Sequence, residues 1–266
     1  MNKPDLFPSR WCWRGVAVCN LLAAVLLASW LWQPTRQLWD ALDIRLFHLL
    51  NAPLSASPIW AHLWAIGSMR PVDAGVGLLM VAILAKDNWV YSGPQVRQAF
   101  YAFLALLLVL LLIRVGLFVE LVRLMKWTHA SPSLAVDGAV RLTEMFPDWQ
   151  ERWDMKDSAG QSFPGDHASV VLLWVMLLSV HTRGWKLFTV WVLAVVFMLP
   201  RLVSGAHWVS DALVGGAFLS LVTFGWGYFT PFTAKASELL ERLGAPVMRV
   251  LGRIPGLRRI ALISGR

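Results

Sequence analysis

The sequence predicts an all-α, polytopic membrane protein: a bundle of six transmembrane helices with further helical segments on its outer surface. Of the 266 residues, 57% are hydrophobic and only 15% are charged, which is typical of a membrane protein and not of a soluble domain. Apolar runs of about 17 to 25 residues, the length that crosses a bilayer as a helix, recur along the chain. We expect one integral membrane domain over residues 1–230 and a basic amphipathic tail over residues 231–266.

The expected spans cover residues 15–32, 72–85, 99–122, 168–181, 185–203 and 207–230. A short apolar segment, 58–67, precedes the second span and is separated from it by "GSMRPVD". If this segment is re-entrant or interfacial, the chain has six spans. If it crosses the membrane, the chain has seven. The first run ends in "WLWQPT" without a clear small-residue cleavage site, so we expect an uncleaved span and not a signal peptide.

Charge placement predicts that both termini are cytoplasmic. With six spans in this orientation, the inner segments carry 14 basic and four acidic residues, a net charge of +10, and the outer segments carry a net charge of −3. An excess of Lys and Arg on the cytoplasmic side is the usual pattern of helical membrane proteins. The outer ends of the spans then face the opposite side of the membrane.

Two segments on the outer side have distinct patterns. In "RQLWDALDIRLFHLL" (residues 36–50), leucines recur at helical spacing with charges between them, at positions Leu38, Leu42, Leu46 and Leu49. This pattern suits a helix lying on the outer surface or, equally, an ordinary packed loop helix. Residues 128–163 form a long loop punctuated by Pro and Gly, and loops of this length are usually functional or disordered.

The tail and the tryptophans indicate contact with the membrane surface. The stretch "RVLGRIPGLRRIALISGR" is basic and amphipathic, so we expect it to lie against anionic lipids, with a solvated tail as the alternative. Tryptophans near span ends are expected to be interfacial anchors; they are Trp30, Trp32, Trp185 and Trp208.

Two groups of polar residues stand where spans begin or end. "PGDH" (164–167) opens the fourth span, and Arg201, His207 and Asp211 lie around the start of the sixth. His207 and Asp211 are four residues apart, so on a helix a carboxylate can bond the imidazole. Taken alone, this pair is more often a capped helix start with a polar interfacial residue.

The predicted topology brings these groups to one membrane face, because Arg201, His207 and His167 lie at the outer ends of three consecutive spans. Arg binds phosphate oxygens in a bidentate manner, and His can attack phosphorus. A second His can protonate the leaving oxygen. Gly165 adds bare backbone at a helix start, which favours an anion. The set predicts phosphoryl transfer.

These motifs resemble those of the type 2 phosphatidic acid phosphatase superfamily, whose signature is K-x6-R-P, then P-S-G-H, then S-R-x5-H-x3-D, on a six-helix membrane fold without a metal or other cofactor. The third motif matches at Arg201, His207 and Asp211, with Pro200 in place of Ser. The second matches at Pro164 and His167, with Gly165 and Asp166 replacing Ser and Gly. The first is degraded in "RLMKWTHASPS".

"SFPGDH" and "GAHW" are further similar to one subgroup, the lipid A 1-diphosphate synthases of Gram-negative bacteria. The resemblance implies an inner-membrane phosphotransferase in lipopolysaccharide biosynthesis, with a periplasmic active site and no nucleic-acid partner. It implies undecaprenyl pyrophosphate as donor and the 1-phosphate of lipid A as acceptor. The alternative is a lipid phosphatase with water as acceptor, and a transporter or a relative with a decayed site is a minor alternative.

The resemblance also implies residue roles. His207 is then the nucleophile, Asp211 its orienting carboxylate, His167 the general acid and Arg201 a phosphate clamp, with Gly165 and Asp166 at the phosphate. Candidates for a second clamp are, in order, Lys126, His129 and Arg123. We expect Asp166 to favour the protonated ring of its neighbour His167 and to favour an acceptor phosphate over water. For Arg114, inside the third span, we expect snorkelling, pairing with Glu120 or Asp211, or a structural place in the bundle interior.

Overall fold

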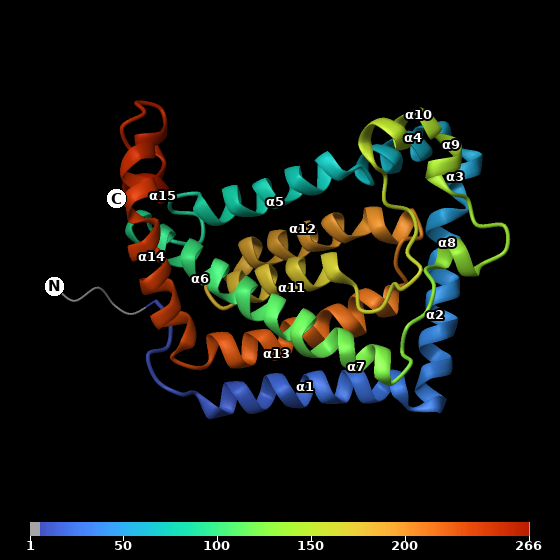
Figure 1. Ribbon diagram of the computed structural model, residues 1–266, viewed down its shortest axis with the longest axis horizontal. Helices are drawn as coiled ribbons and strands as arrows, with labels where there is room; N and C mark the ends of the chain where they lie inside the picture. Colours follow the sequence, from blue (N-terminus) through green and yellow to red (C-terminus); the bar gives the residue numbers. More distant parts are fainter. Residues whose placement is uncertain (1–5, 266) are drawn as a thin grey trace.

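The computed structural model describes residues 6–265 and is helical throughout, as expected (Figure 1). Its described residues form no strand, only an isolated bridge between Met69 and Met155. Lys3, Asp5 and Arg266, which are among the residues counted for the charge of the inner segments, lie outside the described residues.

The bundle consists of long helical segments that run side by side (Figure 1). They are α1 (Trp13–Leu31), α5 (Arg70–Ala85), α6 (Gly93–Ile113), α11 (Asp166–Ser179), α12 (Gly184–Val203) and α13 (Ala217–Tyr228). A π-helical segment, η1 (Arg114–Phe118), and α7 (Val119–Leu124) continue α6, and a second π-helical segment, η2 (Asp211–Gly216), leads into α13. The buried Trp174 of α11 ties the bundle together because its indole N–H donates to the carbonyl of Met80 on α5 at 3.1 Å.

By length and composition, three helical stretches of the described chain can cross a membrane: 13–31, 93–124 and 184–203. A fourth is counted if residues 211–228 and 232–251, which are bent by 80° at their junction, form one broken span. The helices α5 and α11 have 16 and 14 residues and are shorter than that measure requires. The chain is therefore a helical membrane protein, and the count of six spans stays a prediction.

The sixth span begins later than expected, whereas the short apolar segment has the bounds expected for it. The sixth helical segment begins at Asp211, not at residue 207, because His207 lies in the turn between α12 and η2. The short apolar segment is a separate ten-residue helix, α4 (Pro58–Gly67). It packs outside the main core, where its Ala61 and Ala65 join an apolar cluster with Leu142 and Val203.

Helix α2 (Gln33–Asn51) lies across one end of the bundle (Figure 1). The face predicted to be apolar points away from the protein: Leu38 and Leu49 are 70% and 68% exposed. Its opposite face buries Asp43, Phe47 and Asn51. The side-chain amide of Asn51 donates to the carbonyls of Val140 and Val203, which fixes α2 to the long loop and to α12.

The long loop is ordered by short helices and buried polar contacts. Its helices are α8 (Pro132–Ala135), α9 (Leu142–Met145) and α10 (Pro147–Trp153); α8 lies beside α2, and α9 and α10 lie near α3 (Pro53–Ala56) and α4 (Figure 1). The buried carboxylate of Asp157 accepts from the backbone and the hydroxyl of Thr143, at 2.9 and 2.7 Å. Because such contacts satisfy its polar groups, the loop forms a cap on this end of the bundle.

The tail forms α14 (Phe232–Leu251), the 3-10 segment η3 (Leu257–Arg259) and α15 (Ala261–Ser264) at the other end (Figure 1). Helix α14 packs against α6, and the 80° bend turns it across the bundle. The two ends of the molecule therefore carry different structures.

Candidate active site

Most of the predicted site residues meet at the end of the bundle that α2 and the long loop cover. Gly165 allows this convergence, because its backbone N–H donates to the carbonyl of Asp211 at 3.0 Å. A Cβ atom at position 165 would lie 2.9 Å from that oxygen. Only a residue without a side chain lets the start of α11 approach η2 so closely.

His207 is buried, with both ring nitrogens near an acceptor. Its Nδ1 lies 2.9 Å from the carbonyl oxygen of Ser162 and 3.5 Å from Oδ2 of Asp211. Because a carbonyl only accepts, Nδ1 carries the hydrogen, and Nε2 is the nitrogen left for chemistry. Nε2 lies 3.4 Å from Oδ1 of Asp166.

The two carboxylates raise the pKa of His207. Burial of the ring opposes protonation, but the interactions with Asp166 and Asp211 outweigh it and raise the pKa to about 9. The ring is therefore cationic at neutral pH in this arrangement. Nε2 must lose its proton before it can act as a nucleophile.

Asp211 is fully buried and has several donors. Its Oδ2 accepts from the backbone N–H of Trp208 at 2.8 Å, and its Oδ1 lies 2.9 Å from Nε2 of His129. The carboxylate therefore joins His129, from the long loop, to His207. This places His129 beside the cluster.

Asp166 does not contact the ring of His167, in contrast to our expectation. Its Oδ1 accepts from the backbone N–H of His167 at 2.7 Å, and its carboxylate faces His207 and Arg114, 3.5 Å from the Arg114 guanidinium. The ring of His167 turns to α12, where its Nε2 lies 3.0 Å from the carbonyl of Phe197. Consecutive residues on a helix point in different directions, so sequence adjacency did not imply contact. Arg114 pairs with Asp166 and not with Glu120 or Asp211.

Arg201 is buried and held in place. One Nη donates to the carbonyl of Lys156 at 3.1 Å, and the other forms an ion pair with Asp73 of α5. A buried guanidinium needs such partners, because an unpaired charge in the interior is costly. His167, Arg201 and His207 together line a cavity of about 10 Å³, which is large enough for at most one water molecule. Side chains must therefore move to admit a phosphate.

The three candidates for a second clamp are placed differently. His129 contacts the cluster through Asp211, as described above. Lys126 is exposed, and its side chain forms no hydrogen bond or ion pair with any residue in the described part of the chain, although its backbone N–H donates to the carbonyl of Arg123. Arg123 is also exposed and pairs with Glu120. The structure brings neither Lys126 nor Arg123 into contact with the other site residues.

Two acids near the site were missed by the sequence analysis. Asp73 forms an ion pair with Arg201. The sequence feature that could have identified it is an acid at the start of an apolar run, where ionisable groups are rare. Asp43 of α2 accepts from the backbone and hydroxyl of Ser210, at 2.8 and 2.5 Å, and so fixes the turn next to Asp211. Burial raises the pKa of Asp43 to about 6, and the bonds from Ser210 limit that rise.

The interpretation of Trp30 as an interfacial anchor is wrong. Trp30 is 1% exposed, and its ring stacks on Phe163 with centroids 4.4 Å apart. It packs there because Phe163 precedes the Pro164–Gly165 turn into α11. Trp32 and Trp185 are exposed, as an anchor requires, and Trp208 donates its indole N–H to the carbonyl of Ala130.

No three His, Cys, Asp or Glu residues between positions 6 and 265 are grouped so as to hold a metal ion. A second pocket, of about 270 Å³, borders the cluster on the side of α2. Arg36, Asp43, His129 and Ser210 are among the residues that line it. His129 therefore stands between this pocket and Asp211.

Comparison with known proteins places these residues in a family. The profile of the PAP2 superfamily matches residues 98–235. The chain is 27% identical to the lipid A 1-diphosphate synthase of Escherichia coli strain K12 over 227 residues, which cover 85% of this chain and 92% of that protein. It is 26% identical to the putative undecaprenyl-diphosphatase YbjG of the same organism over 176 residues, 66% of this chain and 76% of that protein. No solved structure matches.

Proposed function

Because this chain belongs to the PAP2 superfamily, a family of lipid phosphatases and phosphotransferases, we propose that it transfers a phosphoryl group from undecaprenyl pyrophosphate to the 1-phosphate of lipid A. The reaction takes place at the periplasmic face of the inner membrane of a Gram-negative cell, with both termini cytoplasmic. The observation that carries the proposal is the fixed ring of His207, whose Nδ1 is bonded to Ser162 and whose Nε2 remains for attack. The similarity to a lipid A 1-diphosphate synthase supports the choice of donor and acceptor.

In the first step, Nε2 of His207 attacks the terminal phosphorus of the donor. A nitrogen–phosphorus bond forms, and the bond from phosphorus to the bridging oxygen breaks. His167 gives a proton to that oxygen, so undecaprenyl phosphate leaves. In the second step, an oxygen of the acceptor phosphate attacks the phosphohistidine, the nitrogen–phosphorus bond breaks and His207 is restored.

The remaining residues of the cluster orient the nucleophile and bind phosphate. Asp211 stabilises the ring of His207 in the tautomer that leaves Nε2 free. Arg201 binds the transferring phosphoryl group, and its contacts with Asp73 and with the carbonyl of Lys156 hold the guanidinium at the site while neighbouring side chains move to admit the phosphate. Gly165 lets the N-terminus of α11, whose helix dipole favours an anion, lie close to the cluster. His129 is the second clamp in this proposal, ahead of Lys126 and Arg123, because it contacts Asp211.

Asp166 has the role of selecting the acceptor. Its carboxylate lies 3.4 Å from Nε2 of His207, the nitrogen that attacks phosphorus, and it stabilises the protonated ring, so Nε2 gives up its proton to solvent before the attack. A carboxylate at this point is also a base for the phosphate oxygen of the acceptor. We expect Asp166→Gly to lower the ratio of transfer to hydrolysis, and an unchanged ratio contradicts this role.

A second candidate function is hydrolysis of undecaprenyl pyrophosphate by the same cluster with water as acceptor. It is favoured by the similarity to a putative undecaprenyl-diphosphatase. Both functions share the first step and differ only in the second.

The experiment that separates them uses the purified full-length protein and a donor labelled in its terminal phosphate, with and without lipid A. Transfer predicts labelled lipid A diphosphate whenever lipid A is present. Free phosphate as the only labelled product under both conditions contradicts transfer and leaves hydrolysis.

A further inference from the structure

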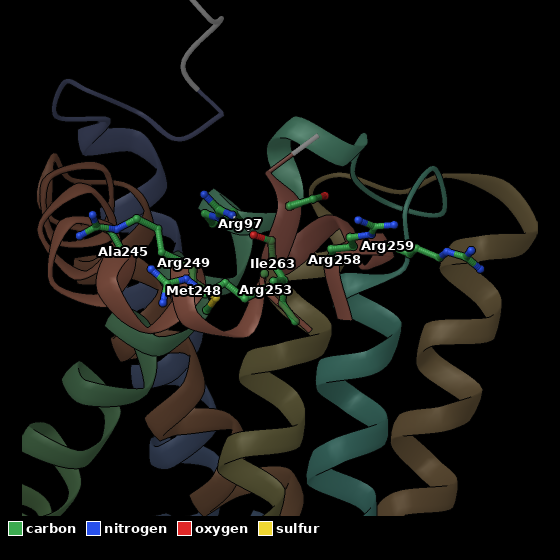
Figure 2. A pocket seen from close by; sticks show the side chains of 10 residues that line it. Arg97, Ala245, Met248, Arg249, Arg253, Arg258, Arg259 and Ile263 are labelled. Atoms are coloured by element: carbon green, nitrogen blue, oxygen red, sulfur yellow. Dashed lines mark hydrogen bonds between the residues drawn. The ribbon is translucent and has the colours of Figure 1, made fainter. Parts of the chain in front are cut away.

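A cavity lined by arginines lies at the α14 end of the molecule, away from the catalytic cluster (Figure 2). Its volume is about 710 Å³. The arginines come from four segments: α6 near its start, the end of α14, the turn that follows α14 and η3. They are Arg97, Arg249, Arg253, Arg258 and Arg259.

No carboxylate between residues 6 and 265 neutralises the charge of this cavity. No Asp or Glu of the described chain lines it, and none of the five arginines forms an ion pair with a described carboxylate. A guanidinium stays charged at any physiological pH, so like charges face each other across the cavity. An anion between them removes that repulsion, and Arg pairs with phosphate oxygens through two parallel hydrogen bonds.

The walls of the cavity are fastened to each other. Arg97 donates through Nε to the carbonyl of Leu262 at 3.0 Å and through Nη2 to the carbonyl of Ile263. These bonds tie α15 to the first turn of α6. The arginines of α14 and η3 therefore face a formed concavity and do not belong to a loose tail.

An apolar stripe runs along α14 beside the cavity. Large apolar side chains that are 57% to 67% exposed recur every three or four residues, which places them on one face: Leu239, Leu243, Val247 and Val250. Because α14 is bent by 80° from α13, this face lies across the end of the bundle. A helix with this arrangement buries its apolar face at the boundary of headgroups and acyl chains, next to anionic lipids.

We propose that the arginine cavity is a binding site for the phosphate headgroup of an anionic phospholipid of the bilayer. The cavity supplies the charge, and the stripe on α14 places it at the depth of the headgroups. This proposal does not rest on the proposed function, since the cavity lies at the end of the molecule opposite the catalytic cluster.

The test measures lipid binding to the purified full-length protein by native mass spectrometry, with phosphatidylglycerol and phosphatidylcholine added to the detergent. Arg253→Gln with Arg258→Gln removes two charges from the cavity. Lys235→Gln with Arg242→Gln removes two charges from α14 outside the cavity and is the matched control. At about 1 kcal/mol per basic residue, we expect the cavity variant to bind phosphatidylglycerol roughly 25-fold more weakly, and the control to match the wild type.

Three results overturn the proposal: an equal loss in both double variants, which indicates diffuse surface attraction; unchanged binding in the cavity variant; or release of the lipid by millimolar inorganic phosphate, which indicates a site for a soluble anion. Thermal unfolding checks that the variants fold. If the double variant aggregates, Arg258→Gln alone is expected to weaken binding about fivefold, since η3 is exposed.

Discussion

At the catalytic end of the bundle, Arg201 and Asp211 are buried, and each has a partner of opposite charge or a hydrogen-bond donor. At the α14 end, Arg249 and Arg258 are exposed and have no carboxylate partner among the described residues. Burial explains the difference, because a charge in the interior must be paired whereas an exposed one is solvated. Charges that are buried and paired hold the groups that transfer a phosphoryl group in fixed positions. Charges that are exposed and unpaired attract an anionic membrane surface.

The largest expected effect is that of His207→Ala, which removes the proposed nucleophile. We expect kcat for loss of the donor to fall by about 10³-fold or more. His62→Ala is the control, since the exposed His62 ring contacts the carbonyl of Pro58 and the rings of Phe146 and Trp149, none of which belongs to the site. Turnover assays with both variants in one detergent check the comparison, and near-normal activity of His207→Ala rejects the assignment.

Arg201→Lys is expected to lower kcat/KM by about 10²-fold, because an ammonium cannot bind a phosphoryl group in a bidentate manner while it contacts Asp73 and Lys156. Arg70→Lys, at an exposed ion pair with Asp154, is the matched control and should change kcat/KM by less than about twofold. Equal losses in the two variants contradict a special role for the buried guanidinium.

The pH profile sharpens the role of Asp166. Burial opposes protonation of His207, but its carboxylate partners raise its pKa to about 9, so the nucleophile becomes neutral only as the pH rises. We expect log kcat/KM to increase with pH up to about pH 9. Asp166→Asn removes one carboxylate and is expected to move this rising limb of the pH profile about one pH unit lower. A limb that does not move contradicts the pairing of Asp166 with Nε2.

The same pKa shift affects stability. The folded pKa is above the unfolded value of 6.5, so protonated His207 stabilises the folded state below about pH 6.5, and this contribution is lost as the pH rises through about 9.

The smallest expected effect is a loss of stability caused by packing, and it differs between the two ends of the molecule. Gly165→Ala places a methyl group 2.9 Å from the carbonyl oxygen of Asp211 and is expected to lower the free energy of unfolding by about 1–3 kcal/mol. Gly256→Ala, at the α14 end, meets no atom within 4 Å and is expected to leave stability unchanged or slightly raised. Thermal unfolding of the two variants measures the difference; equal melting temperatures contradict the close approach at Gly165.

The sequence predicted the helical bundle and the family, and both are confirmed. The spacing of His207 and Asp211 and the turn at Gly165 are local, and local patterns indicated that these residues belong together. The partners Asp43 and Ser210 are 167 residues apart, and Asp73 and Arg201 are 128 apart, so no spacing rule joins them. Trp30 was misassigned for the same reason, since its partner Phe163 comes from a distant loop.

The central claim is that Nε2 of His207 accepts the phosphoryl group. Its most direct test is acid-free trapping of the protein after brief mixing with donor labelled in its terminal phosphate. We predict label on His207, stable to base and lost in acid, in the wild type and in His62→Ala, and none in His207→Ala. Label retained in His207→Ala, or carried by another residue, contradicts the account.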